Sequence, residues 1–118
     1  MRVDPFDVEW AEDDPLGREI VLLKSTVEAR ERAGKHQGAE FLDSGEIRRI
    51  VTDPDRIDLT GKSPRHTEIY YIEQTEQPHP YGRVVVFFDD DAGYPISWSR
   101  YERPVSYMER IYERGDTP

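Results

Sequence analysis

Three strand-like runs in the second half of the chain constrain the fold more than any other feature. They span residues 66–72, 83–88 and 96–101 and are rich in β-branched and aromatic residues. Proline, glycine and aspartate fill the segments between them, as is typical of turns. The middle run contains five consecutive apolar residues, from Val84 to Phe88, which indicates a central strand. The pattern therefore predicts an antiparallel meander of three strands.

The first half of the chain predicts helices instead. A helix is expected over residues 25–35, where Ser25 and Glu28 have the spacing of a capping box. A second helix is expected over residues 46–51. A short C-terminal helix is expected from Pro104, because apolar residues follow it at helical spacing. The predicted fold class is α+β, with N-terminal helices packed on a small twisted antiparallel sheet.

The length of 118 residues predicts one folded domain. An acidic irregular N-terminal arm is expected over residues 1–18, although its alternating apolar residues also fit an edge strand. The α+β domain is expected over residues 19–114, opening with a short apolar strand. Residues 115–118 are expected to be a tail.

Composition limits where the protein works and what it binds. Cysteine is absent, which fits a reducing compartment, and the acidic start does not resemble a signal peptide. No apolar run approaches the roughly 20 residues of a membrane span, so a cytoplasmic protein without membrane contact is expected. The net charge of -9 argues against a nonspecific grip on nucleic acid. Six of the acidic residues fall within residues 1–14, however, so the rest of the chain is less acidic and could form a local basic cleft.

Several side chains suit the cleavage of RNA without a metal ion. That reaction needs a base for the 2′-hydroxyl, an acid for the leaving oxygen, and cations or donors for the charged phosphorane. Histidine titrates near neutral pH and arginine binds phosphate, while tyrosine and serine can orient a base. The catalytic candidates are His36, Arg65, His66, Ser97 and Ser99, and the substrate-binding candidates are Tyr70, Arg100 and Tyr101. Each also fits a structural role at a helix end or on the exposed face of a strand.

Metal-binding patterns are not found in the sequence. His36, His66 and His79 stand apart, without the spacing of zinc ligands. The run Asp89-Asp90-Asp91 lacks the alternating ligands of a calcium loop and predicts an acidic hairpin turn. No metal and no cofactor are therefore expected.

The order of these features resembles the small toxins of the barnase–EndoU–colicin–RelE-like (BECR) nuclease fold. The phage-associated branch is the nearest in pattern, and BrnT-type toxins are more distant. The matching features lie within about residues 19–103 and comprise Lys35-His36, residues 53–57, Arg65, Ile69-Tyr70-Tyr71, residues 84–86 and Ile96-Ser97-Trp98-Ser99. The resemblance implies metal-independent RNA cleavage from the sheet face. It assigns the catalytic roles to His36, Arg65 and a hydroxyl of Ser97 or Ser99, and it implies a toxin with a cognate antitoxin.

A second hypothesis is a non-enzymatic acidic binding protein, such as a phage-type inhibitor or an immunity protein. A negatively charged domain can block the basic surface of a nucleic-acid-binding partner. Asp89, Asp90 and Asp91 are its candidate contacts, together with the N-terminal acids. A small structural domain is the third reading. The expected partner is therefore RNA or a protein, and a homodimer formed by pairing of edge strands stays open.

Overall fold

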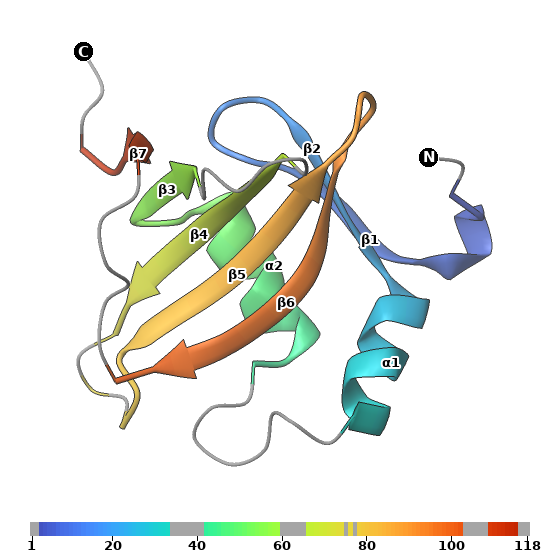
Figure 1. The fold of residues 1–118 in the computed structure, drawn as a ribbon, viewed down its shortest axis with the longest axis horizontal. Helices are drawn as coiled ribbons and strands as arrows, with labels where there is room; N and C mark the ends of the chain where they lie inside the picture. Colours follow the sequence, from blue (N-terminus) through green and yellow to red (C-terminus); the bar gives the residue numbers. More distant parts are fainter. Residues whose placement is uncertain are drawn as a thin grey trace.

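The structure is a computed structural model that describes residues 3–33, 42–59, 66–74, 76, 78–102 and 109–115. Within these ranges seven strands form one mixed sheet in the order β1-β2-β6-β5-β4-β3-β7 (Figure 1). The elements are the 3-10 turn η1 (Pro5–Asp7), β1 (Val8–Asp13), β2 (Glu19–Leu23), α1 (Lys24–Ala33), α2 (Ser44–Thr52), β3 (Arg56–Leu59), β4 (Thr67–Glu73), β5 (Tyr81–Phe88), β6 (Gly93–Tyr101) and β7 (Glu109–Glu113).

The predicted meander forms the centre of the sheet. β4 pairs with β5 and β5 pairs with β6, both antiparallel, so that Tyr71, Arg83 and Ser99 lie in one cross-strand row. β5 is the middle strand of the whole sheet, as its apolar run predicted. Val84 and Val86 are fully buried on one side, whereas Val85 between them is half-buried on the other.

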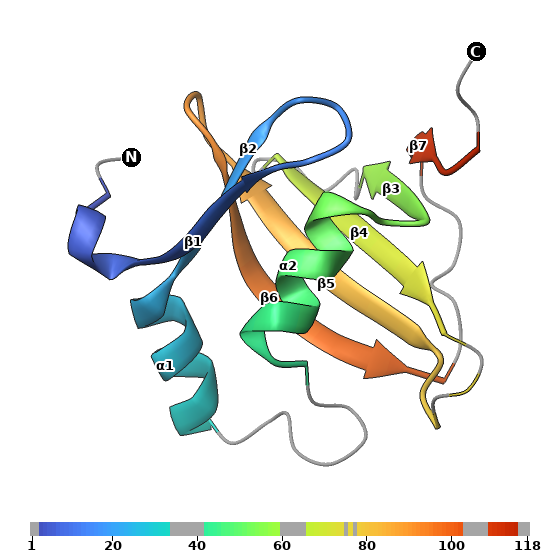
Figure 2. The same ribbon diagram turned by 180° about the vertical axis from the view of Figure 1, so that it is seen from behind.

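Helix α2 covers one face of this meander (Figure 2). Asp43 caps it, accepting a hydrogen bond of 2.8 Å from the backbone N–H of Glu46. Its apolar residues Ile47, Ile50 and Val51 are at most 1% exposed and pack into the main core. The other members of that core come mainly from the strands and are Ile20, Leu22, Leu42, Ile57, Tyr70, Ile72, Val84, Val86 and Trp98.

The N-terminal segment expected to be irregular contributes an edge strand. β1 pairs antiparallel with β2, and the indole N–H of Trp10 donates to the backbone oxygen of Ser44 at 3.1 Å. β2 then joins β6 in parallel through the single pair Ile20 and Gly93. A Cβ at Gly93 would lie 2.8 Å from Ile20 Cδ1, so the close approach of these strands requires glycine.

The predicted fold class is wrong in two respects. Strands dominate the described chain, and β1 and β2 precede both helices, so helices do not form an N-terminal layer on a small sheet. Nor do the described residues contain the predicted C-terminal helix, because residues 109–113 form β7 instead. Pro104 itself lies outside the described residues. The edge of β3 gains backbone hydrogen bonds from β7, and such pairing overrides a weak local helical pattern.

Helix α1 lies beside the sheet and does not bury a side chain completely. The carboxylate of Asp7 accepts hydrogen bonds from both the N–H and the hydroxyl of Ser25, so η1 supplies the cap for this helix. Arg30 reaches from α1 to the backbone oxygen of Ile96 on β6 at 3.3 Å. None of the helices in the described ranges is long and apolar enough to span a membrane.

Candidate functional site

The face of the sheet turned away from α2 carries the polar and aromatic side chains that can do chemistry. Because Tyr70 and Val84 point into the core under α2, their neighbours along each strand point the other way. We call this surface the open face. Its residues on β3 to β6 are Arg56, Asp58, Ile69, Tyr71, Glu73, Tyr81, Arg83, Val85, Ser97, Ser99 and Tyr101. No helix of the described chain lies over β4, β5 and β6 on this side (Figure 1).

Arginine and tyrosine alternate across the middle of the open face. The register places Arg56, Tyr71, Arg83 and Ser99 in one row over four strands. The guanidinium carbon of Arg56 lies 4.4 Å from the centre of the Tyr71 ring, and that of Arg83 lies 3.7 Å from the centre of the Tyr101 ring. Stacking on a ring holds each guanidinium in place and leaves its N–H groups able to bind phosphate in a fork. No ion pair joins Arg83 to a carboxylate of the described residues, and its partners are the Tyr101 ring and the Tyr71 phenol.

Two ionisable groups on this face have pKa values shifted by burial. Burial raises the pKa of the Tyr71 phenol, while nearby Arg83 and Arg56 act in the opposite direction. Burial also raises the pKa of Asp58, against the effect of the two arginines that flank it at 3.5 Å, Arg56 and Arg110. Both shifts follow from taking a charge out of water. Asp58 therefore offsets part of the charge of Arg56, whereas no ion pair joins Asp58 to Arg83 among the described residues.

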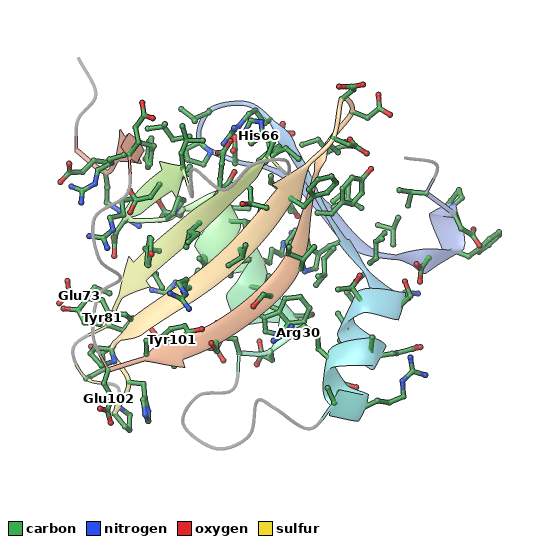
Figure 3. The ribbon with its side chains drawn as sticks, viewed as in Figure 1. Arg30, His66, Glu73, Tyr81, Tyr101 and Glu102 are labelled. Atoms are coloured by element: carbon green, nitrogen blue, oxygen red, sulfur yellow. The ribbon has the colours of Figure 1, made fainter. Side chains whose placement is uncertain are left out.

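One end of the open face adds carboxylates and a histidine. Glu73, Tyr81 and Tyr101 form the row next to Arg83, and Figure 3 shows them together with Glu102 at this end of the sheet. Glu73 is exposed, and its backbone N–H is fixed by Asp55 Oδ2 at 2.7 Å. Here His79 Nε2 lies 3.6 Å from Glu102 Oε1.

A second polar cluster surrounds His66 at the other end of the sheet (Figure 3). The His66 side chain is 57% exposed, and its Nε2 lies 2.7 Å from Glu68 Oε2. Glu68 is 1% exposed and also accepts two hydrogen bonds from Arg18, at 2.8 and 2.7 Å. Arg18 Nε donates to Asp14 Oδ2 at 2.9 Å, and the Tyr70 hydroxyl donates to the same oxygen at 2.5 Å.

This second cluster holds the connection between β1 and β2 on the sheet. Asp14 accepts from the backbone N–H groups of Leu16 and Arg18, and Arg18 also lies 4.4 Å over the Phe88 ring. Burial and the bond to Asp14 raise the pKa of Tyr70, so its hydroxyl stays protonated as a donor. Since Arg18 already neutralises Glu68, the geometry indicates a structural network with one exposed imidazole at its edge.

The structure brings together only some of the residues that the sequence singled out. Ser97, Ser99 and Tyr101 share the open face, where Ser97 and Tyr101 are half-buried and Ser99 is 5% exposed. Tyr70 and Arg100 are buried on the α2 side of the sheet, at 0% and 5% exposure.

Of the three remaining candidates, only His66 lies within the described residues, and it is not grouped with the others. His66 lies at the far end of the sheet from Tyr101 (Figure 3). His36 and Arg65 lie outside the described residues.

Several residues of the open face were missed by the sequence analysis. Arg83 enters the sequence analysis only as the start of a predicted strand, His79 only as a histidine without zinc-ligand spacing, and Tyr81 and Glu73 are not among its candidates. Their grouping depends on the register of β4, β5 and β6, which pairs Tyr81 with both Glu73 and Tyr101. Alternation along the meander could have placed Arg83 and Tyr81 on one face, but it does not give the register.

Comparison with known proteins adds no assignment, because no family model, no curated protein and no solved structure matches the chain. Within the described residues, no three histidine, cysteine, aspartate or glutamate side chains group as metal ligands. The resemblance to BECR nucleases stays a prediction from sequence. The function is therefore argued from the geometry of the open face.

Proposed function

We propose that this chain is a small ribonuclease that cleaves RNA by general acid–base chemistry on its open face. The observation that carries the proposal is the grouping of Arg83, Tyr81, Tyr101 and Glu73 in two adjacent rows of the sheet. A cation, two aromatic rings and a carboxylate are the groups that RNA binding and transesterification need. All of these groups are side chains of the protein itself.

Each residue has a distinct role in the proposed reaction. Arg83 binds the scissile phosphate and stabilises its developing negative charge, with Arg56 as a second cation along the row. Tyr81 and Tyr101 offer aromatic surface to an unpaired base. Ser97, half-buried beside this group, can donate a hydrogen bond to the nucleotide.

The proton transfers fall to the carboxylate and the histidine at the end of the face. Glu73 takes the proton of the 2′-hydroxyl, whose oxygen then forms a bond to phosphorus. The bond from phosphorus to the 5′-oxygen breaks, and His79 gives that oxygen a proton. The products are a 2′,3′-cyclic phosphate and a 5′-hydroxyl. His79 suits this role because it is placed beside Glu102 at the same end of the sheet.

The acidic composition is compatible with this reaction because many acids have internal partners. Asp4 caps η1, Asp7 caps α1, Glu12 pairs with Arg48 and Asp14 lies in the buried network. The absence of cysteine suits a cytoplasmic protein. We further propose cellular RNA as the substrate and an inhibitory antitoxin as the protein partner, as the resemblance implies.

Cleavage of a fluorescently labelled single-stranded RNA in EDTA tests the proposal. The wild-type protein is expected to cleave, and Arg83→Gln is expected to lose about 100-fold or more in kcat/KM, the scale of removing one charge-stabilising group. Arg48→Gln is the matched control, because Arg48 is 57% exposed on α2, the helix that covers the opposite face. A wild-type protein without activity, or equal losses in both variants, would refute the assignment.

A specific feature also favours the acidic binding protein as a second candidate. The turn between β5 and β6 exposes Asp90 and Asp91, whereas Asp89 Oδ1 holds the turn through the N–H groups of Asp91 and Ala92. This role lowers the pKa of Asp89 to about 2. Asp90→Asn combined with Asp91→Asn removes charge and keeps the turn. The second candidate predicts that this double variant binds a basic nucleic-acid-binding partner more weakly at low salt; unchanged affinity would exclude the turn as the contact.

A further inference from the structure

Arg100 is a charged side chain buried in the interior of the protein. It lies on the α2 side of β6 and is 5% exposed, directly across from Gly82 of β5. Its Nη2 donates to Glu46 Oε2 at 2.5 Å and to Gln74 Oε1 at 2.8 Å. Its Nη1 has no hydrogen-bond partner among the described residues. Burying a charge costs free energy that a single ion pair seldom recovers, so an apolar side chain would serve packing better.

The contacts of Arg100 join α2 to the end of β4. Glu46 belongs to the first turn of α2, and Gln74 follows Glu73 directly. The backbone N–H of Gln74 donates to the oxygen of Pro80 at 2.8 Å and so closes the connection between β4 and β5. His79 immediately precedes Pro80 in that connection. Arg100 therefore anchors the base of the segment that carries both proposed proton-transfer residues.

Gly82 leaves the space that this arrangement needs. A Cβ at Gly82 would lie 2.9 Å from Ile72 Cγ2 and 3.1 Å from Ile50 Cδ1, and Arg100 Nη1 would be 3.8 Å away. A larger residue would therefore crowd Ile72 and Ile50 of α2, whereas Arg100 Nη1 would be in ordinary van der Waals contact. Gly82 thus lets α2 pack closely on β5 next to the buried guanidinium of Arg100.

We propose that Arg100 is a positioning residue, which holds Glu73 and His79 in place relative to Arg83 through its bonds to Gln74 and Glu46. The inference rests on the proposed function. It differs from the role predicted from the sequence, in which Arg100 contacts the substrate. A buried Arg100 acts from behind the sheet, on the geometry of the proton transfers and not on RNA binding.

The test compares kcat and KM for RNA cleavage in the wild type, Gln74→Ala, Arg100→Met and Arg100→Lys. Gln74→Ala keeps the buried ion pair, so it removes the link without disturbing the fold. We expect its kcat to fall about 10- to 100-fold, the effect of misplacing reacting groups by about 1 Å. KM is expected to change less than about twofold, since Arg83, Tyr81 and Tyr101 are untouched. Arg100→Lys, which keeps the charge, is expected to retain more activity than Arg100→Met.

Thermal unfolding of each variant separates positioning from folding. Arg48→Met is the control for loss of an exposed arginine, because Arg48 pairs with Glu12 away from the site. An unchanged kcat in folded Gln74→Ala and Arg100→Met would overturn the positioning role while leaving the proposed function intact. A rise in KM alone would overturn it too and would point to substrate contact. An inactive wild type would instead refute the proposed function, and the positioning role with it.

Discussion

At the scale of the residue, the open face depends on arginines that are stacked on tyrosines. Arg83 over Tyr101 and Arg56 over Tyr71 combine a delocalised cation with an aromatic ring at 3.7 and 4.4 Å. A lysine cannot reproduce that planar contact or the paired N–H groups that bind phosphate. The proposed chemistry therefore depends on specific pairs of side chains, whereas the net charge of -9 is unfavourable to RNA binding.

The ring of Tyr101 is expected to contribute stacking energy to RNA binding. Tyr101→Leu removes the aromatic surface and the support of Arg83, so the affinity for a single-stranded RNA should fall about 5- to 100-fold, the scale for one stacked base. Tyr101→Phe keeps the ring and should bind almost as the wild type does. Fluorescence anisotropy at fixed salt measures both affinities. Equal losses in the two variants would mean that the hydroxyl matters and the ring does not.

Asp58 is expected to lower the stability at neutral pH. Its pKa is raised in the folded protein, so the folded state binds the proton more tightly than the unfolded state does. The cost of its charged form is therefore present above the folded pKa and disappears as the pH falls towards the unfolded value near 3.8.

Asp58→Asn removes this titration. The variant should be more stable than the wild type at about pH 7, and the difference should shrink as the pH falls to about 4. Urea denaturation at several pH values measures both trends. A variant that is less stable than the wild type at neutral pH would show that the pairs with Arg56 and Arg110 outweigh the cost of burial.

At the scale of the element, local sequence patterns predicted the strands and the helix that depend on residues close together in the chain. They missed the strands that depend on pairing with residues far away in the chain. The strands of the meander and the amphipathic α2 follow from periodicity and turn residues, and the structure confirms them. β3 has only four residues and β7 five; β3 pairs with β4 on one side and with β7 on the other, and within the described residues β7 pairs only with β3. No periodicity in residues 109–113 signals such a partner.

The candidate site was predictable only in part for the same reason. Alternation along a strand places Ser97, Ser99 and Tyr101 on one face, and their pairing with β5 has them there. Alternation could not predict that Glu73 lies beside Tyr81, because that pairing is set by the connection between β4 and β5. Nor could it show that Arg100 is buried, since an arginine on a strand is usually exposed.

The connection between β1 and β2 is expected to depend on Arg18. Arg18→Ala would leave Asp14 and Glu68 buried without their cation, which costs about 3–5 kcal/mol for a broken buried pair. Arg18→Ala combined with Glu68→Gln removes one of the two unpaired buried carboxylates and should recover part of the lost free energy of unfolding. The free energy of unfolding in urea measures both. A loss below about 1 kcal/mol in the single variant would show that the network contributes little to stability.

At the scale of the whole molecule, the sheet has two different faces. α2 and the core beneath it occupy one face, and the arginines and tyrosines of β3 to β6 occupy the other (Figures 1 and 2). The two ends also differ, since the buried network around Arg18 lies near His66 and the proposed proton-transfer residues lie near Tyr101 (Figure 3). In a chain with a net charge of -9, the proposed phosphate contacts would come from the few arginines on the open face.

Few phosphate contacts predict a weak dependence of RNA binding on salt. With two arginines on phosphates, the slope of log affinity against log salt should be about -1.4 for a single strand. Affinities measured across a range of salt concentrations give the slope. A value steeper than about -4 would imply an extended basic surface that the open face does not contain.

Mapping of a bound nucleotide by NMR tests the central claim most directly. The probe is a 2′-deoxy oligonucleotide, which lacks the attacking hydroxyl and therefore stays intact while it is added to the ¹⁵N-labelled protein. We predict chemical-shift changes at Tyr71, Arg83, Ser97 and Tyr101, and none at Ile47 and Ile50 of α2. Changes confined to the surroundings of His66 or to the turn at Asp90, or no change at millimolar ligand, would contradict the assignment of the open face as the site of RNA binding.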